Sequence, residues 1–302
     1  MKPLLTGFFD HDQITIQDQL DNARLHNISE VSLRMVNGFK LGEIDGKTYQ
    51  DILNTVKKSK QKVVCLDPNL DPYDLYQEKR HKEAIETYKE IMILANKIKT
   101  PYIALRLPKF QNVIEEIEVI NPYIEDYIHL AQQYHKKYIL IPSSEHKANT
   151  YAYILKKFKT NILNMSFDPV YFYLNGESTT TSYRLLKKHI TFIRANDCDI
   201  KGTPKLLGHG KTDFLKIAKR LIRDKYQGYI FVDNRLDELI HRPEPEVKKS
   251  IFKKIFTKSQ KKQLNLYEDL KMQLKWQDPQ KNVTYDDILD NQIKLLNYIF
   301  RV

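Results

Sequence analysis

The sequence predicts a (β/α)8 barrel, because eight short apolar runs recur along the chain and a longer amphipathic or charged stretch follows each one. The runs are continuous rather than alternating, as expected for parallel strands that are covered on both faces. Their spacing of roughly 25 to 40 residues is the span of a strand, a helix and two loops. The eight runs are Leu4–Phe9, Ile28–Leu33, Lys62–Leu66, Tyr102–Leu107, Tyr138–Ile141, Ile162–Phe167, Ile190–Ile193 and Tyr229–Val232.

The segments between the runs have helical periodicity. In Lys82–Ile98 the apolar side chains fall on one face, and Phe214–Arg223 follows the same pattern. An open doubly wound sheet is the alternative architecture, but it usually has fewer strands and a glycine-rich first turn. Gly7 alone does not make that fingerprint. The closed barrel is therefore favoured.

The 302 residues match a single barrel of about 250 residues with one insertion. After the eighth run, residues 241–246 (HRPEPE) stop the pattern, and residues 241–264 are expected to form a basic insertion before the last helix. Within it, Val247–Lys262 has apolar residues at helical spacing among lysines, which predicts a helix outside the barrel wall. Residues 279–302 should close the barrel with a final helix that Thr284 or Asp286 caps.

Composition narrows the class of protein. Cys65 and Cys198 are too few for a disulfide scaffold and lack metal-ligand spacing, which favours a cytoplasmic location. No run approaches the roughly 18 apolar residues that cross a membrane. The net charge of +11 suggests an anionic partner, but seven lysines between Lys248 and Lys262 supply much of it, so a nucleic-acid partner is not expected.

Charged and polar residues follow the predicted strands, where barrel enzymes place their active sites. Three arginines and several carboxylates should therefore converge on one mouth. Neutralising salt bridges would explain any single residue, but clustered buried charge favours a binding site. The residues at the strand ends are Asp10, His11, Arg34, Asp67, Asn69, Arg106, Lys109, Ser143, Ser144, Glu145, Asp168, Arg194 and Asp233.

Three ordered motifs then resemble the xylose isomerase-like superfamily of TIM-barrel sugar isomerases, epimerases and related apurinic-site endonucleases. Residues 192–197 (FIRAND) resemble its strand-7 motif, residues 207–214 (LGHGKTDF) its LGxGxxD loop, and residues 225–233 (KYQGYIFVD) its entry into strand 8. Upstream, residues 141–146 (IPSSEH) and 166–169 (SFDP) are similar to its strand-5 and strand-6 motifs. Recognisable motifs cover residues 138–233.

The resemblance implies a metal site whose ligands in the family are Glu, Asp, His and Glu. These positions fall on Glu145, Asp168, Arg194 and Asp233. Arginine stays protonated and cannot ligate a cation, so the family's third ligand is lost here. Glu145, Asp168 and Asp233 are left as candidate ligands for Mn²⁺, Mg²⁺ or Zn²⁺, which Arg194 would repel. We expect Arg194 to occupy the metal's place and to pair with one of the three carboxylates.

Three functions remain open. The favoured one is a sugar or sugar-phosphate isomerase or epimerase, with Glu145 and Asp233 as acid and base and Arg194 as electrophile. Arginine and lysine would bind the phosphate or carboxylate of a small anionic sugar. The second is a barrel that binds a ligand but has lost the catalytic activity, and the third is a nuclease. A homodimer is possible in each case. The expected substrate-binding residues are Arg34, Arg106, Lys109, His11, Asn69 and Lys201.

The LGxGxxD segment should be a loop at the mouth, outside the core, that either binds phosphate or shapes the local backbone. Gly208 and Gly210 would allow backbone conformations that other residues avoid, and Asp213 would cap the following helix. A plain turn without a ligand role is the other interpretation.

Overall fold

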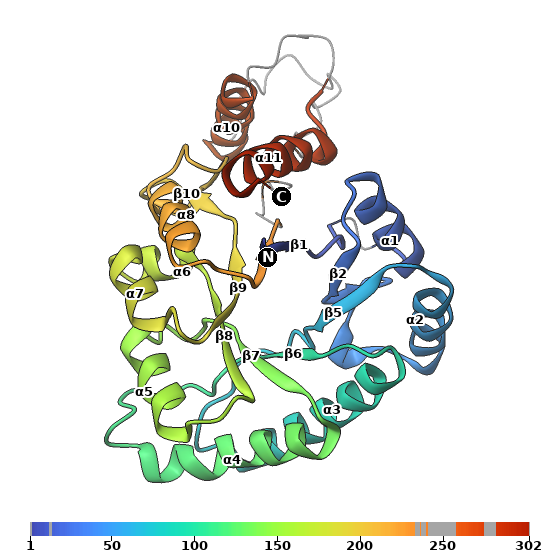
Figure 1. Cartoon of the computed structure of the whole chain (residues 1–302), viewed down its shortest axis with the longest axis vertical. Coiled ribbons are helices and arrows are strands. Elements are labelled where there is room, and N and C mark those ends of the chain that lie inside the picture. Colours follow the sequence, from blue (N-terminus) through green and yellow to red (C-terminus); the bar gives the residue numbers. More distant parts are fainter. Residues whose placement is uncertain are drawn as a thin grey trace, which may run out of the picture.

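The structure, a computed structural model, describes residues 2–11, 14–232, 236, 240, 258–274 and 282–301, with the backbone alone for 258–265. Eight parallel strands form one sheet in the order β1-β12-β9-β8-β7-β6-β5-β2. The Ser32 amide of β2 donates to the carbonyl of Gly7, just after β1, at 3.0 Å, so the two ends of this order meet. The predicted (β/α)8 barrel is therefore confirmed (Figure 1). The strands are β1 (Leu4–Thr6), β2 (Glu30–Leu33), β5 (Lys62–Leu66), β6 (Tyr102–Leu105), β7 (Lys137–Leu140), β8 (Leu163–Phe167), β9 (Ile190–Arg194) and β12 (Tyr229–Phe231).

Helices surround the sheet and bury its outer face (Figure 1). Two short hairpins lie in the loops that follow β2 and β9. The helices are α1 (Ile16–Leu25), α2 (Gly46–Lys58), α3 (Glu78–Lys97), α4 (Ile117–Tyr134), α5 (Ala148–Phe158), α6 (Pro169–Leu174), α7 (Thr179–Leu186), α8 (Phe214–Arg223), α10 (Lys258–Gln273) and α11 (Tyr285–Phe300). The hairpins are β3 (Met35–Val36) with β4 (Phe39–Lys40), and β10 (Asp197–Cys198) with β11 (Pro204–Lys205); the 3-10 turn η1 (Leu41–Glu43) follows the first.

Aromatic side chains fill much of the barrel interior. Phe192 stacks on Tyr229 with ring centroids 4.8 Å apart, and Phe231 lies 4.9 Å from Phe8. Phe8, Phe192 and Phe231 belong to one buried cluster, with Tyr102 and Tyr229 packed against it. The interior is thus a packed core and not a pore.

Helix α11 closes the barrel beside α1. Thr284 caps it, because its side chain accepts from the Asp287 amide while the Asp287 carboxylate accepts from the Thr284 amide. The ring of His26, just after α1, lies between two carboxylates of α11, 2.8 Å from Asp290 and 3.2 Å from Asp286. The predicted closing helix is confirmed, with Thr284 rather than Asp286 as its cap.

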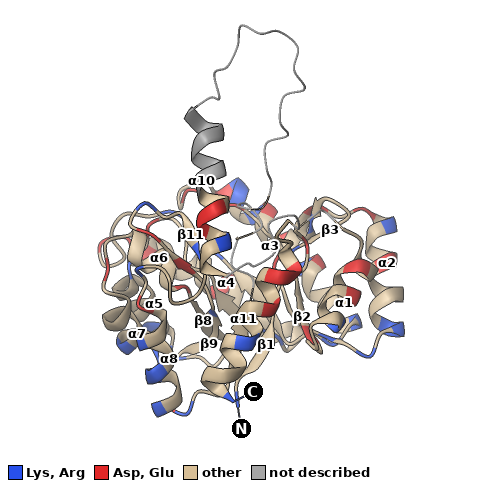
Figure 2. Cartoon of the chain, turned by 90° about the horizontal axis from the view of Figure 1, so that it is seen from above, with Lys and Arg blue, Asp and Glu red and all other residues tan. Residues whose placement is uncertain are grey.

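The basic segment Val247–Lys262 lies outside the described residues up to residue 257, so its place against the barrel stays a prediction. From residue 258 its backbone belongs to α10, which lies at the end of the barrel opposite to both chain termini (Figure 2). Over the described part of the chain, no helix combines the length and the apolar character needed to cross a membrane.

Candidate functional site

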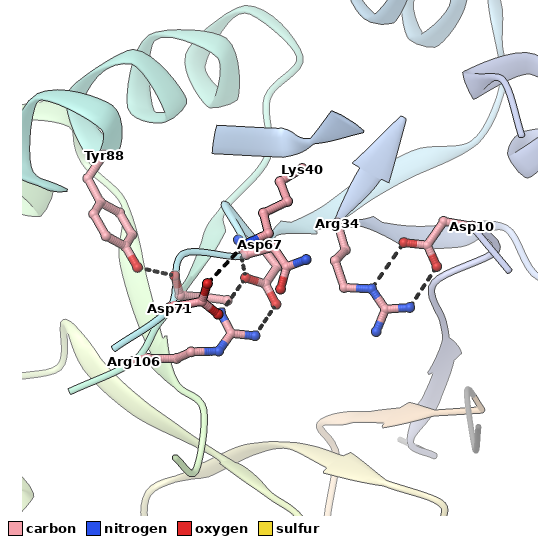
Figure 3. A network of polar contacts seen from close by, with 9 residues as sticks. Asp10, Arg34, Lys40, Asp67, Asp71, Tyr88 and Arg106 are labelled. Carbon is pink, nitrogen blue, oxygen red and sulfur yellow. Dashed lines mark hydrogen bonds and ion pairs between the residues drawn. The ribbon is translucent and has the colours of Figure 1, made fainter. Parts of the chain in front are cut away.

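Two aspartate–arginine pairs lie at the carboxyl ends of neighbouring strands (Figure 3). Asp10 follows β1 and Arg34 follows β2; the Arg34 Nε and Nη2 donate to the two Asp10 oxygens at 3.0 and 2.7 Å. The Asp10 side chain is 2% exposed, whereas that of Arg34 is 27% exposed. The carboxylate is therefore a buried anchor, and the guanidinium reaches the mouth.

The second pair repeats this arrangement on the next two strands, β5 and β6. Arg106 follows β6 and donates through Nη1 and Nη2 to both oxygens of Asp67, at 2.7 and 2.9 Å. Burial raises the pKa of the Asp67 carboxyl, but attraction to Arg106 and the hydrogen bonds from Arg106 and the Asn69 amide outweigh it, so the pKa lies below its ordinary value. Asp67 therefore holds its negative charge and fixes Arg106 at the mouth.

Arg194, at the end of β9, contacts the same aromatic ring as Arg34. The Arg34 guanidinium carbon is 4.6 Å from the centroid of the Phe8 ring and that of Arg194 is 5.9 Å from it. Arg194 is also 5.7 Å from the Phe231 ring, and both distances suit a cation–π contact. The predicted convergence of arginines on the mouth is thus present in the geometry.

Glu145 and His146 follow β7 on a turn. The backbone of Glu145 is left-handed, with φ +58°, and its side chain is exposed. His146 is buried: its ring stacks on Phe110 at 4.1 Å and its Nε2 is 2.9 Å from the Pro108 carbonyl. Burial lowers the pKa of His146, which makes it a neutral, packed group.

Asp168, which follows β8, is engaged locally. Its Oδ1 accepts from the Tyr171 amide at 3.1 Å, which caps α6, and from Nδ2 of Asn196 at 2.9 Å. The Tyr171 hydroxyl in turn donates to the carbonyls of Ser143 and His146, at 2.7 and 3.0 Å. Tyr171 thus joins the ends of β7 and β8.

The implied metal does not fit the described donors. No three of the His, Cys, Asp and Glu side chains that the structure describes gather as an ion would require. Asp168 already accepts two hydrogen bonds, Glu145 is on an exposed turn, and Arg194 brings a cation to the same end of the barrel. Asp233 lies outside the described residues, so its role and its pairing with Arg194 stay predictions.

The remaining predicted substrate-binding residues differ in position. His11 packs its ring 4.1 Å from Tyr285 of α11, and Asn69 is a left-handed turn residue beside Asp67. Lys109 is exposed, with a backbone bridge to Asp74. Lys201 is exposed at the tip of the β10–β11 hairpin. Ligand contact by these four remains a prediction.

Backbone amides of the LGHG loop donate hydrogen bonds to a buried carboxylate of the protein itself. Asp197, 2% exposed, accepts from the amides of Gly208, Gly210 and Thr212, each at 3.0 Å. It also accepts from the Thr212 hydroxyl at 2.8 Å. The loop therefore shapes the structure around β9 but does not offer these amides to phosphate, which corrects that expectation.

Gly208 agrees with the expectations for this loop, whereas Gly210 and Asp213 depart from them. Gly208 has φ +85°, as expected for a position that favours glycine, but Gly210 is not among the described glycines with positive φ. Asp213 stands at the start of α8 but makes no side-chain cap; its carboxylate lies 2.9 Å from Lys216. In the sequence, Asp197 is the last residue of the FIRAND motif, and only the fold brings it to the loop glycines.

The fold and this mouth define a (β/α)8 barrel with arginines fixed at the strand ends. Solved structures with this architecture include a xylose isomerase domain protein and a D-psicose 3-epimerase. The chain is similar to a D-psicose 3-epimerase with D-tagatose from Clostridium cellulolyticum H10. The match covers 100% of this chain and 99% of that one, with TM-score 0.65 and 11% identity. It is also similar to a xylose isomerase domain protein from Planctomyces limnophilus over 78% of this chain and 89% of that one (TM-score 0.62, 14% identity).

A third solved structure, an IolI protein with a bound zinc atom, matches 76% of this chain and 88% of that one, with TM-score 0.62 and 16% identity. No protein-family model matches the sequence, and the search of curated proteins finds no match. The likeness therefore establishes the fold.

Proposed function

We propose that the protein acts at the carboxyl end of its barrel on a small anionic sugar or sugar phosphate, as an isomerase or epimerase. One observation carries this proposal: Arg34 and Arg194 lie over the same Phe8 ring, and a buried carboxylate holds Arg34 in place. Cations fixed in this way suit a phosphate or carboxylate, because their orientation costs no further entropy on binding. A neighbour described as a D-psicose 3-epimerase with D-tagatose supports a sugar as the ligand.

In this proposal the chain's own side chains move the proton. Glu145 removes or returns a proton at the carbon next to the sugar carbonyl, and Asp233 is its counterpart on the opposite side. Arg194 stabilises the negative charge that develops on the carbonyl oxygen, as a fixed cation does in a site with little water. Arg34 and Arg106 bind the anionic group, and His11, Asn69, Lys109 and Lys201 complete the mouth.

A barrel that binds the same ligand without chemistry is the second candidate. It is favoured by the commitment of Asp10, Asp67 and Asp168 to hydrogen bonds and ion pairs with the protein. An acid–base catalyst needs a carboxylate that can exchange its proton with substrate, and Glu145 is the described residue that best keeps this ability.

Deuterium exchange distinguishes the two candidates. The protein is incubated in D₂O with D-psicose, D-tagatose or D-fructose 6-phosphate, and proton NMR follows loss of the hydrogen next to the carbonyl. Exchange that falls by about 10²-fold or more in Glu145→Gln supports the enzyme. Ligand binding without exchange supports the binding barrel. If none of the three sugars exchanges or binds at millimolar concentration, the proposed substrate class is wrong. Glu125→Gln on the exposed face of α4 is the matched control.

A further inference from the structure

A cavity of about 480 Å³ lies beside the barrel mouth, on the far side of the Asp67–Arg106 pair from Arg34. Strand β4, η1, the loop after β5 and helix α3 enclose it, and Arg106, Tyr88 and Tyr127 form part of its wall. In Figure 3 the Asp67–Arg106 pair stands between Tyr88 and the Asp10–Arg34 pair. The volume is within the range of small-molecule sites, and the cavity is distinct from the centre of the barrel.

A hydrogen-bonded chain fixes the polar character of one cavity wall. The Tyr73 oxygen lies 2.6 Å from Nδ1 of His81 and 3.1 Å from the Tyr127 hydroxyl. On its other side, Nε2 of His81 lies 2.8 Å from the Asp126 carboxylate. A carboxylate only accepts, so Nε2 donates to Asp126, and in the tautomer that carries its proton on Nε2 the Nδ1 atom accepts from the Tyr73 hydroxyl.

This polarity leaves Tyr73 with an acceptor for a ligand. Its own proton is directed to His81, and the Tyr127 hydroxyl donates to one of its two lone pairs. Tyr73 lines the cavity, so a ligand hydroxyl that reaches its oxygen could donate to the second lone pair. Burial raises the pKa of Tyr73 to about 12, so the hydroxyl keeps its proton at neutral pH.

Arg106 is the cation in the inner wall of the cavity, because the other cations that line it are paired at the rim. At the rim, Lys40 is 3.0 Å from Asp71, and Arg80 is 3.3 Å from Glu83, so these charges offset one another. Arg106 directs Nη1 and Nη2 to Asp67, and no hydrogen bond from its Nε to the described residues is found. Its guanidinium thus combines a fixed position with an unused donor.

We propose that this lateral cavity binds a small hydroxylated anion, whose phosphate or carboxylate meets Arg106 and whose hydroxyl group donates to Tyr73. Phenol rings beside a fixed cation suit a polyhydroxylated carbon skeleton, because apolar ring faces and directional acceptors are both present. The site does not depend on isomerase or epimerase activity, since it would equally serve a barrel that only binds.

Isothermal titration tests the site with four probes: D-fructose 6-phosphate, D-gluconate, D-fructose and inorganic phosphate. The expected result is binding of at least one of the first two, about tenfold tighter than D-fructose and tighter than phosphate. A preference for D-fructose 6-phosphate or D-gluconate identifies the anion as phosphate or carboxylate. Equal affinity for D-fructose would contradict the role of Arg106.

Paired variants then locate the binding. Tyr73→Phe keeps the ring but removes the acceptor, and we expect about fivefold to twentyfold weaker binding of the tighter probe. Tyr76→Phe is the control, because Tyr76 is 65% exposed three residues away and its hydroxyl donates to Glu116. Ala84→Leu places a larger side chain in the cavity wall and should abolish binding without removing a polar group.

Thermal melts and circular dichroism confirm that each variant folds. If Tyr73→Phe or Ala84→Leu fails to fold, paramagnetic or chemical-shift mapping of the wild-type protein locates the probe instead. Affinity unchanged in both variants, shift changes confined to the barrel mouth, or no binding of any probe at millimolar concentration would each overturn the proposal. Exchange activity at the mouth is measured separately and decides only the proposed function.

Discussion

Asp197 and Gly210 fit each other because the glycine has no side chain: a Cβ on Gly210 would stand 2.1 Å from Oδ1 of Asp197 and 2.5 Å from the carbonyl of Cys198. The Gly210 amide meanwhile donates to Oδ2 of the same carboxylate at 3.0 Å. The loop after β9 and the carboxylate within it therefore form one packed unit.

Gly210→Ala should destabilise the protein by about 2 to 4 kcal/mol, because backbone and a buried carboxylate must both move to admit the methyl group. Gly46→Ala is the control, since nothing lies within 4 Å of its added Cβ and the residue begins helix α2. The control should be neutral or slightly stabilising. Urea denaturation measures both, and equal effects would refute the close fit.

Asp197→Asn should lower the free energy of unfolding by about 3 kcal/mol. The amide group replaces one carboxylate oxygen with a donor that faces backbone amides and the Thr212 hydroxyl. Asp199→Asn is the matched control. Asp199 also accepts hydrogen bonds from two backbone amides, but it is less buried than Asp197. Its cost should stay below about 1 kcal/mol. Denaturant midpoints measure both, and a control as damaging as Asp197→Asn would show that burial is not decisive.

The Asp67–Arg106 pair predicts a specific pH dependence of stability. The folded pKa of Asp67 lies below its ordinary value of 3.8, so its contribution is present above about pH 4 and is lost as pH falls through the folded pKa. Asp67→Asn should cost about 3 to 5 kcal/mol at pH 7, because Arg106 loses its buried partner.

The difference between wild-type and Asp67→Asn should then shrink as the pH falls from 5 to 2, since only the wild-type protein loses this ion pair. Thermal or urea denaturation across that range measures it. A difference that stays constant over the range, or grows toward acid, would contradict the assigned direction of the shift.

The purified protein should contain no stoichiometric divalent metal, because the described donors do not gather around an ion and Arg194 brings a positive charge to that end of the barrel. Its melting temperature should not change with EDTA. Elemental analysis by inductively coupled plasma mass spectrometry checks this. One equivalent of zinc or manganese, with a chelator-sensitive melting temperature, would contradict it.

The barrel was predictable from sequence because its strands are buried on both faces and so appear as continuous apolar runs. Strand β5 begins and ends at the predicted residues, Lys62 and Leu66. The β3–β4 and β10–β11 hairpins were not predicted, because strands of two residues have no measurable periodicity.

At the mouth, the sequence predicted which residue types meet but not how they pair. Arg34 follows β2 with Asp10 and Asp67 both on neighbouring strands, and only the geometry shows that it binds Asp10. The turn at Glu145 was also hidden, because a positive φ at a non-glycine residue leaves no mark in the sequence.

The contact between His26 and Asp290 joins positions 264 residues apart, and β1 pairs with β12 across nearly the whole chain. Contacts of such sequence separation form slowly, because a long loop must close before they stabilise it. During synthesis, α1 must therefore wait for residues 286–290 of α11, and the first strand must wait for residues 229–231 of β12 to leave the ribosome. Until then one edge of the sheet stays open, and that interval is when the nascent chain most needs protection from aggregation.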